Sequence, residues 1–339
     1  MSLPGISLDA VVEVLKTIAE PTRLRILNLL ADCDLTVSEL TAILGQSQPR
    51  VSRHLKLMLD SRLIRRRQEG SWALFRLSRD AAGDVLVQEL LSRIDKADET
   101  VRRDRERLVD VKSKRREKAS AYFSKNASSW DEIRSLHVAD DTVEKALMSL
   151  IGDKPVRYML DLGTGTGRIL ELLSGVYQYG IGIDSNREML NIARSNLDSA
   201  GVRNAEVRLG DVYNPPVSRN SFDLVTIHQV LHFLDDPAEV IRQAARTMRP
   251  GARLAIVDFA PHALDFLRDE HAHHRLGFSD QDIAAWLAGA ELDLSASTEL
   301  AAGKEGSDRL TVKIWVADDR RIEIADDIAD TLSPLETVA

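Results

Sequence analysis

The segment YMLDLGTGTGR, residues 158–168, constrains the fold of this chain more than any other feature. An apolar, strand-like run leads into a turn with three glycines, and a helical pattern follows. The glycines are Gly163, Gly165 and Gly167, spaced two and two. A dinucleotide-binding fold would instead place its third glycine at position 168, which is arginine here. Such a turn lets the backbone approach a ligand that a side chain would obstruct, so we expect a strand–turn–helix unit that binds one.

Strand-like runs alternate with helical ones beyond Val156. The expected strands are 158–163, 179–184, 205–211, 222–228, 252–259, 291–296 and 310–317. Alternating strands and helices imply a mainly parallel sheet that is covered on both faces. The fold expected for this part of the chain is therefore α/β and Rossmann-like.

Polar side chains lie where these strands end, which is where open α/β sheets bind ligands. Asp161 precedes the glycine turn, and Asp184 closes the second strand, where a carboxylate can accept both ribose hydroxyls of a nucleoside. His228 and His232 flank the end of the fourth strand. These two histidines are the candidate catalytic residues: they could orient a nucleophile or remove a proton, or they could be polar lining of an inert pocket.

The arrangement D-x-G-x-G-x-G at 161–167 resembles motif I of class I S-adenosylmethionine-dependent methyltransferases, and the resemblance covers residues 121–317. It implies a domain that binds S-adenosylmethionine or S-adenosylhomocysteine. The upstream segment 121–136 resembles the lid region of the ubiquinone-biosynthesis type of these enzymes, so aromatic residues there, Phe123 among them, are expected to close over the cofactor. The cofactor-binding residues expected are Asp161, Gly163, Gly165, Gly167, Asp184, Ser185, Asp211, Val212, His228, Tyr122, Trp130 and Arg134.

The N-terminal part of the chain has a different pattern. Residues 9–31 have helical apolar spacing interrupted at Pro21, and 34–45 and 46–64 predict two further helices. Residues 64–78 alternate apolar and polar residues on both sides of a Glu-Gly pair, which predicts a hairpin. Helices followed by a hairpin in this order predict a winged helix-turn-helix.

Charge is concentrated in the same region. The whole chain has a formal charge of −8, yet nine basic and only two acidic residues lie between Gln46 and Arg79. A basic island on an acidic protein is typical of a surface that contacts a polyanion, although a solvated surface without a partner would show the same composition.

Residues 12–79 resemble the ArsR/SmtB family of winged-helix repressors, through the segments 15–30, 35–64 and 65–78. The resemblance implies a homodimer that binds an inverted repeat in double-stranded promoter DNA. Recognition helices offer their N-terminal residues to base edges, and the wing contacts the backbone or the minor groove. The DNA-binding residues expected are Ser47, Gln48, Arg50, Ser52, Arg53, His54, Arg65, Arg66 and Arg67, with Val51, Leu55 and Leu59 holding the helix in the core.

A metal site is not expected. Cys33 is the only cysteine and is better explained as a buried structural residue. The histidines at 262, 271, 273 and 274 follow no metal-ligand spacing, so an acceptor-pocket or interdomain role is preferred. The chain has no run of eighteen apolar residues and no secretory pattern at its start, so we expect a cytoplasmic protein without membrane contact.

A chain of 339 residues is expected to form more than one domain. The expected boundaries are a winged-helix domain at 1–83, a charged connecting helix with a possible dimerisation role at 84–120, a methyltransferase-like domain at 121–320 and a tail at 321–339. Three functions fit these domains. The cofactor domain could sense its ligand and control operator binding, or be a working methyltransferase for a small molecule under autoregulation, or use the winged helix for protein contact only. The third ranks last because it leaves the basic helix unexplained.

Overall fold

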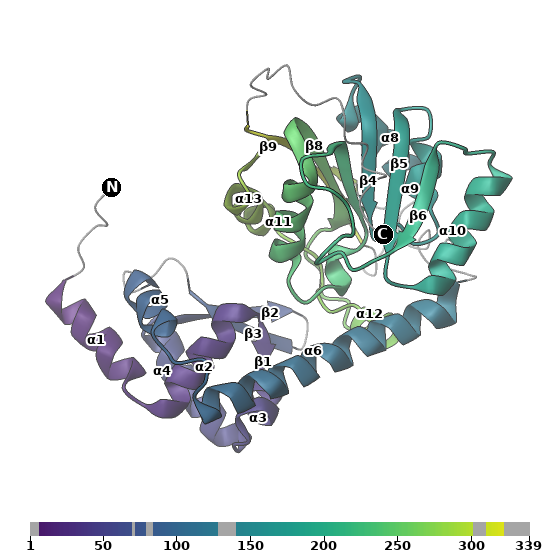
Figure 1. Cartoon of the computed structure of the whole chain (residues 1–339). Coiled ribbons are helices and arrows are strands. Elements are labelled where there is room, and N and C mark those ends of the chain that lie inside the picture. Colours follow the sequence, from purple (N-terminus) through teal and green to yellow (C-terminus); the bar gives the residue numbers. More distant parts are fainter. Residues whose placement is uncertain (1–6, 70–71, 79–83, 128–139, 301–309, 322–339) are drawn as a thin grey trace. The chain divides into compact units, whose positions relative to one another are not determined.

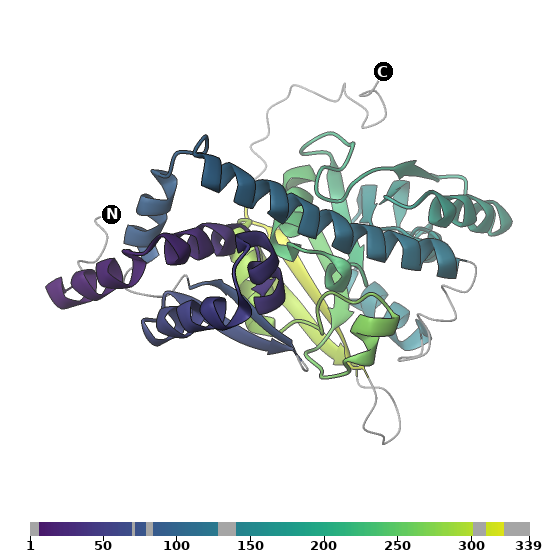
Figure 2. The same ribbon diagram turned by 90° about the horizontal axis from the view of Figure 1, so that it is seen from below.

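The computed structural model describes residues 7–69, 72–78, 84–127, 140–300 and 310–321, and contacts divide the chain into two compact units, 1–117 and 118–339 (Figure 1). Trp130 and Arg134, expected at the cofactor, and the hairpin tip at residue 70 lie outside the described residues. Helix α6, Glu99–Asn126, is a single long helix that contains the boundary between the units (Figure 2).

The first unit is a small helical domain with a three-stranded antiparallel sheet in the order β1-β3-β2. Besides the first part of α6, its elements are α1 (Leu8–Ile18), α2 (Pro21–Asp32), β1 (Leu35–Thr36), α3 (Val37–Leu44), α4 (Gln48–Asp60), β2 (Ile64–Glu69), β3 (Trp72–Leu77) and α5 (Asp84–Ser92). This is the winged helix-turn-helix predicted from the sequence.

Helix α3 is fixed at both ends by local chemistry. A capping box joins Thr36 and Glu39, in which each side chain accepts a hydrogen bond from the other residue's backbone N–H. Gly45 ends the helix in a left-handed conformation at φ 65°, which glycine adopts at low cost. The turn that follows delivers the chain into α4.

Helix α4 buries Val51, Leu55 and Met58. The expectation for Leu59 is wrong, because that side chain is only partly buried and packs at the margin of the core. Positions 51, 55 and 58 are spaced by four and three residues, so they share one face of the helix, and Leu59 is displaced from it.

The charged segment after the wing is two helices rather than the single connecting helix expected over 84–120. Helix α5 ends at Ser92 and α6 begins at Glu99. The Asp98 carboxylate accepts hydrogen bonds from the N–H groups of Thr100 and Val101, which starts α6 as a new helix. The N-terminal part of α6 is also packed rather than exposed, since Leu108 is buried in the core of the first unit.

The second unit has a seven-stranded sheet in the order β6-β5-β4-β7-β8-β10-β9, which is parallel except that β10 runs antiparallel to both neighbours. Its elements are α8 (Asp140–Ile151), β4 (Val156–Leu162), α9 (Arg168–Leu172), β5 (Tyr177–Asp184), α10 (Arg187–Ser199), β6 (Ala205–Leu209), β7 (Phe222–His228), η2 (Leu231–Phe233), α11 (Pro237–Thr247), β8 (Met248–Phe259), α12 (Phe266–Glu270), α13 (Asp280–Gly289), β9 (Leu292–Leu300) and β10 (Val312–Asp319). The mainly parallel α/β sheet expected from the sequence is confirmed.

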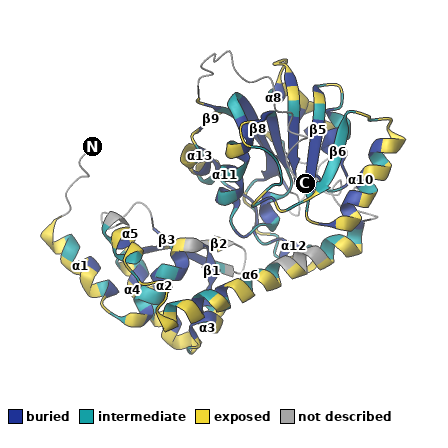
Figure 3. Cartoon of the chain, in the orientation of Figure 1, coloured by how far each residue is buried: buried dark blue, intermediate teal, exposed yellow. Residues whose placement is uncertain are grey.

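Each face of the sheet has its own apolar core. Helices α11 and α13 pack on one face, and α8, α9 and α10 contribute to the core on the other. The central strands are therefore buried on both sides, and the exposed positions fall mainly on the helices (Figure 3).

Candidate cofactor site and nucleic-acid interface

The glycine turn follows β4 and leads into α9. Gly163 has φ 77°, a left-handed conformation that other residues rarely adopt. A Cβ atom on Gly163 would lie 2.4 Å from Val230 Cγ2, so the turn packs directly against the loop that follows β7. The backbone at this position therefore has room for glycine alone.

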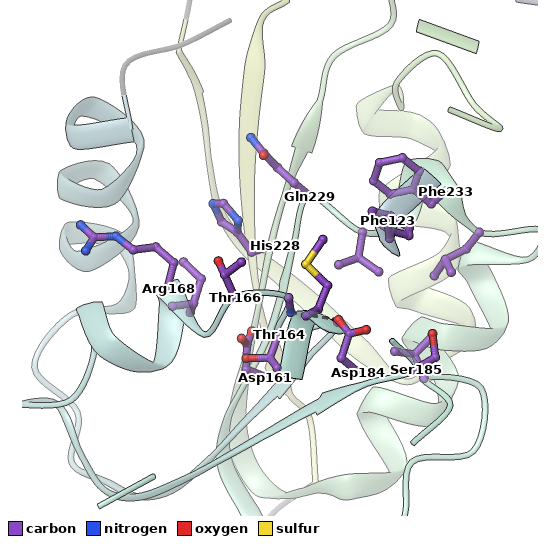
Figure 4. Close-up of a pocket in the computed structure, with 17 residues that line it drawn as sticks. Phe123, Asp161, Thr164, Thr166, Arg168, Asp184, Ser185, His228, Gln229 and Phe233 are labelled. Atoms are coloured by element: carbon purple, nitrogen blue, oxygen red, sulfur yellow. Dashed lines mark hydrogen bonds between the residues drawn. The ribbon is translucent and has the colours of Figure 1, made fainter. Parts of the chain in front are cut away.

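This turn forms the floor of a pocket at the carboxyl ends of β4, β5 and β7, the edge where parallel sheets bind ligands (Figure 4). The lining residues are Phe123, Asp161, Gly163, Thr164, Gly165, Thr166, Arg168, Ile169, Asp184, Ser185, Met189, Val212, His228, Gln229, Val230, Phe233 and Leu234.

Two carboxylates lie in this pocket. The Asp161 side chain is buried, and its Oδ1 accepts a hydrogen bond from Thr226 Oγ1 at 2.6 Å. Asp184 Oδ2 accepts from the N–H of Gly165 at 2.9 Å, and its Oδ1 accepts from the N–H of Asn186 at 2.8 Å. A carboxylate oxygen has two lone pairs, so this arrangement leaves acceptor capacity for ligand hydroxyls.

The electrostatics of Asp184 follow from its burial. Desolvation raises the pKa of the Asp184 carboxyl, and the backbone N–H donors of Asn186 and Gly165 offset only part of this shift. Arg168, which also lines the pocket, is paired with a different carboxylate. Its Nε and Nη2 donate to the two carboxylate oxygens of Glu144 on α8, each at 2.7 Å. Asp184 is therefore a partly buried carboxylate whose ionised form needs partners.

The structure brings seven of the residues expected at the cofactor into this pocket, namely Asp161, Gly163, Gly165, Asp184, Ser185, Val212 and His228. Three others lie elsewhere. Gly167 caps α9 instead of lining the pocket, and Asp211 is exposed and accepts a hydrogen bond from the N–H of Tyr213. The Tyr122 hydroxyl lies 2.7 Å from His271 Nδ1, and its neighbour Phe123 lines the pocket instead.

The expectation that His232 faces the ligand is also wrong. Its side chain is 2% exposed, and Nδ1 lies 2.8 Å from Asp258 Oδ1. The ring packs against Phe233 and His273, with ring centroids 4.0 and 4.2 Å away. His232 is thus a core residue behind the pocket wall, and only His228 keeps a position at the pocket.

Several lining residues gave no distinct signal in the sequence. Phe233, Val230 and Met189 are apolar and cannot be told from ordinary core residues by their pattern. Gln229 is different, because its backbone has φ 54° directly after β7. A non-glycine residue in this conformation is strained, and such strain is frequent at functional sites.

Within the described ranges, no group of three or more His, Cys, Asp or Glu side chains is arranged to hold a metal ion. Cys33 is buried in the core of the first unit.

The outer face of α4 is the candidate nucleic-acid interface. The exposed residues there are Ser47, Gln48, Arg50, Ser52 and Arg53. Arg65 and Arg66 are exposed on β2 of the wing, and the side chain of Arg67 lies outside the described part of the chain. Helix α4 therefore presents short polar groups and guanidinium groups on its exposed face, as a recognition helix requires.

His54 differs from its neighbours on α4. Its side chain is 14% exposed, and Nδ1 lies 3.7 Å from Glu20 Oε2 at the start of α2. Burial lowers the pKa of the His54 imidazole. Its position favours a role in packing α4 against α2 over contact with DNA.

Comparisons with known proteins assign both units. Residues 20–66 match the family described as bacterial regulatory protein, arsR family, and residues 160–256 match the family described as methyltransferase domain. The first unit therefore carries an ArsR-family helix-turn-helix domain, and the second unit carries a methyltransferase domain with a Rossmann-like fold. Both resemblances predicted from the sequence are confirmed at the level of these two domains.

Individual relatives match the second unit. The uncharacterized methyltransferase YcgJ of Bacillus subtilis is 29% identical over 45% of this chain and 59% of its own length. The ubiquinone/menaquinone biosynthesis C-methyltransferase UbiE of Vibrio cholerae is 33% identical over 39% of this chain and 54% of its own length. The crystal structure of the Bacillus YcgJ protein covers 52% of this chain and 98% of its own, at 19% identity and a TM-score of 0.45. The chain spans between about a third and three fifths of the length of the first curated relatives it matches.

None of the helices in the described ranges is both long enough and apolar enough to span a bilayer.

Proposed function

We propose that this protein is a DNA-binding transcriptional regulator, a repressor, whose operator affinity depends on S-adenosylmethionine or S-adenosylhomocysteine in the methyltransferase-like domain. One observation carries this proposal: helix α6 supplies residues to both units. Arg115 on α6 donates to Glu39 of α3 in the first unit, and Phe123, two turns further on, lines the cofactor pocket of the second. A continuous helix with a partner at each end is suited to couple two sites.

The pocket residues suit the parts of this cofactor. The buried carboxylate of Asp161 is placed to offset the positive charge of the cofactor's amino-acid portion, and Asp184 to accept the ribose hydroxyls. Apolar side chains such as Val212 and Phe123 offer surface for the adenine ring. When bound, S-adenosylmethionine supplies a methyl group on an activated sulfonium; these residues hold and orient it.

On the DNA side, the protein acts as a homodimer on an inverted repeat. Arg53 and Arg50 are exposed on α4, where a guanidinium group can fork to guanine, and Gln48 can pair with adenine. The arginines of the wing suit backbone phosphates. A dimer would place two such helices about 34 Å apart, one turn of DNA.

An active methyltransferase for a small molecule is the second candidate, favoured by the strained backbone of Gln229 beside His228 at the pocket. In-line methyl transfer depends chiefly on positioning, so few catalytic side chains are required. His228 would take the proton that the acceptor loses as its new bond to the methyl carbon forms. Formation of S-adenosylhomocysteine from S-adenosylmethionine that requires an added acceptor would support this function. The same formation should be lost in His228→Ala.

The test uses an operator selected from random duplexes with the purified full chain. Titrations at one fixed salt concentration, with and without S-adenosylhomocysteine, should differ by about 5- to 150-fold in operator affinity. Arg53→Ala should weaken operator binding about tenfold or more and leave cofactor binding unchanged. Asp184→Asn should weaken cofactor binding and leave the operator affinity measured without cofactor unchanged. Identical operator affinities with and without cofactor would contradict the proposal.

A further inference from the structure

The last turns of α6 lie against the cofactor pocket. Phe123 lines the pocket, and its ring meets that of Phe233 edge-on with centroids 4.6 Å apart. Tyr122, on the same turn, is tied to His271 through its hydroxyl. The end of α6 therefore forms part of the wall that a ligand would touch.

Ser124 connects α6 to Asp184, the carboxylate of the cofactor pocket. Asn186 Nδ2 donates to Ser124 Oγ at 2.9 Å, and the backbone N–H of the same asparagine donates to Asp184 Oδ1 at 2.8 Å. Asn186 is 5% exposed, and its Oδ1 also caps α10 by accepting from the N–H of Met189. Two hydrogen bonds through one buried asparagine thus link Asp184 to the helix.

The other end of α6 is fastened to the DNA-binding domain. Arg115 Nε and Nη2 donate to Glu39 Oε1 at 2.8 and 2.6 Å, and Glu39 is the residue of α3 that completes the capping box with Thr36. Arg107 Nη1 donates to the carbonyl of Ile43 near the end of the same helix. Helix α3 is the first helix of the helix-turn-helix, so α6 is bonded to both of its ends.

In the middle of α6, the described side chains are mostly polar and exposed. Ser113, Lys114 and Glu117 are exposed, and the segment is strongly charged. A helix this polar is marginal on its own, and helix formation is cooperative, so order at one end favours order along its length.

We propose that Phe123 and Ser124 are positioning residues through which occupancy of the cofactor pocket stabilises the end of α6, and that α6 transmits this state to α3. The inference rests on the proposed function and adds the route of regulation. A ligand contacts Phe123 only when the helix end is docked, so it binds the docked state better and shifts the population toward it. Ser124 holds the docked turn beside Asp184.

The experiment measures S-adenosylhomocysteine affinity by calorimetry, with and without saturating operator, on the full chain. The coupling ratio is the larger of these two dissociation constants divided by the smaller. Linkage requires that cofactor change operator affinity by the same factor. Ser124→Ala removes the hydrogen bonds of Ser124 Oγ with Asn186 and Glu188, and it should bring the ratio about fivefold closer to one. Operator affinity without cofactor should stay within about twofold of the wild-type value, since Ser124 is exposed and remote from α4 in sequence. Lys125→Ala, an exposed change on the same turn, is the matched control and should leave the ratio unchanged.

A second pair of variants tests the helix itself. Glu117→Pro interrupts α6 between Arg115 and Phe123, and Glu117→Ala keeps it. The proline variant should still bind both ligands, with a ratio of about one. If the wild-type coupling ratio exceeds one and both Ser124→Ala and Glu117→Pro keep the wild-type value, transmission through α6 is wrong while the proposed function stands. If the wild-type ratio is itself one, both fall together.

Discussion

At the scale of single residues, Gly163 shows how closely two loops of the pocket approach each other. Its Cβ position is occupied by Val230, and its φ of 77° is unfavourable for any other residue. We predict that Gly163→Ala lowers the unfolding free energy by about 2 kcal/mol, through overpacking and strain, and weakens S-adenosylhomocysteine at least about tenfold. Thermal unfolding and calorimetry measure these two effects.

Gly175→Ala is the matched control for this change. A Cβ at Gly175 meets nothing within 4 Å, and its φ is not positive. This variant should bind cofactor as the wild type does. Wild-type affinity in Gly163→Ala would show that the turn does not need glycine at this position.

Asp184 should make cofactor binding depend on pH. Burial raises the pKa of this carboxyl above its ordinary value of 3.8, so the ligand-free folded state holds a proton that the unfolded state has lost over the window between the two values. The unfolding free energy that this group contributes is therefore highest below 3.8 and falls as pH rises through the folded-state pKa. Cofactor binding has the opposite sign, because only the carboxylate accepts two ribose hydroxyls.

We accordingly predict that S-adenosylhomocysteine affinity falls as pH is lowered from about 8 toward the raised pKa of Asp184. Calorimetry across this range measures it, with circular dichroism to confirm that the chain stays folded. Asp184→Asn should bind weakly and with little dependence on pH. An equally steep dependence in that variant would assign the titration to another group.

At the scale of elements, regular patterns were predictable and packing directions were not. All seven strands of the large sheet were predicted, and the central parallel ones gave the clearest signal, because strands buried on both faces have long apolar runs bounded by turns. The glycine turn and Asp184 were found because their spacing is set by one strand–turn–helix–strand unit, from β4 to the end of β5. The sequence did not predict the direction of side chains whose burial depends on segments distant in the chain.

His232 is an example of that limit. It lies four residues after His228, near the same strand end, yet η2 turns its ring into the core. The N–H groups of His274 and Arg275 both donate to the His232 carbonyl at 2.9 Å, so a segment forty residues away buries it. The break between α5 and α6 was missed for a related reason, since it depends on which aspartate caps a helix.

At the scale of the whole molecule, α6 is the element that contributes residues to both units. Its first part contributes Asp104, 3% exposed, which accepts two hydrogen bonds of 2.6 Å from Arg25 on α2. Its last part contributes Phe123 to the cofactor pocket. A helix shared in this way places the stability of its two ends in one cooperative unit, provided that the polar middle stays helical.

Hydrogen exchange can follow this cooperativity without any DNA. We predict that saturating S-adenosylhomocysteine slows amide exchange most in residues 121–126 of α6, which lie at the pocket, and also in 99–117, because opening of the helix becomes costlier along its whole length. Helix α1 packs on α2 and serves as the internal control, with exchange unchanged by the ligand. Mass spectrometry of peptic fragments separates these three segments. Protection confined to residues beyond 117 would mean that the cofactor domain binds its ligand without any effect on the DNA-binding domain.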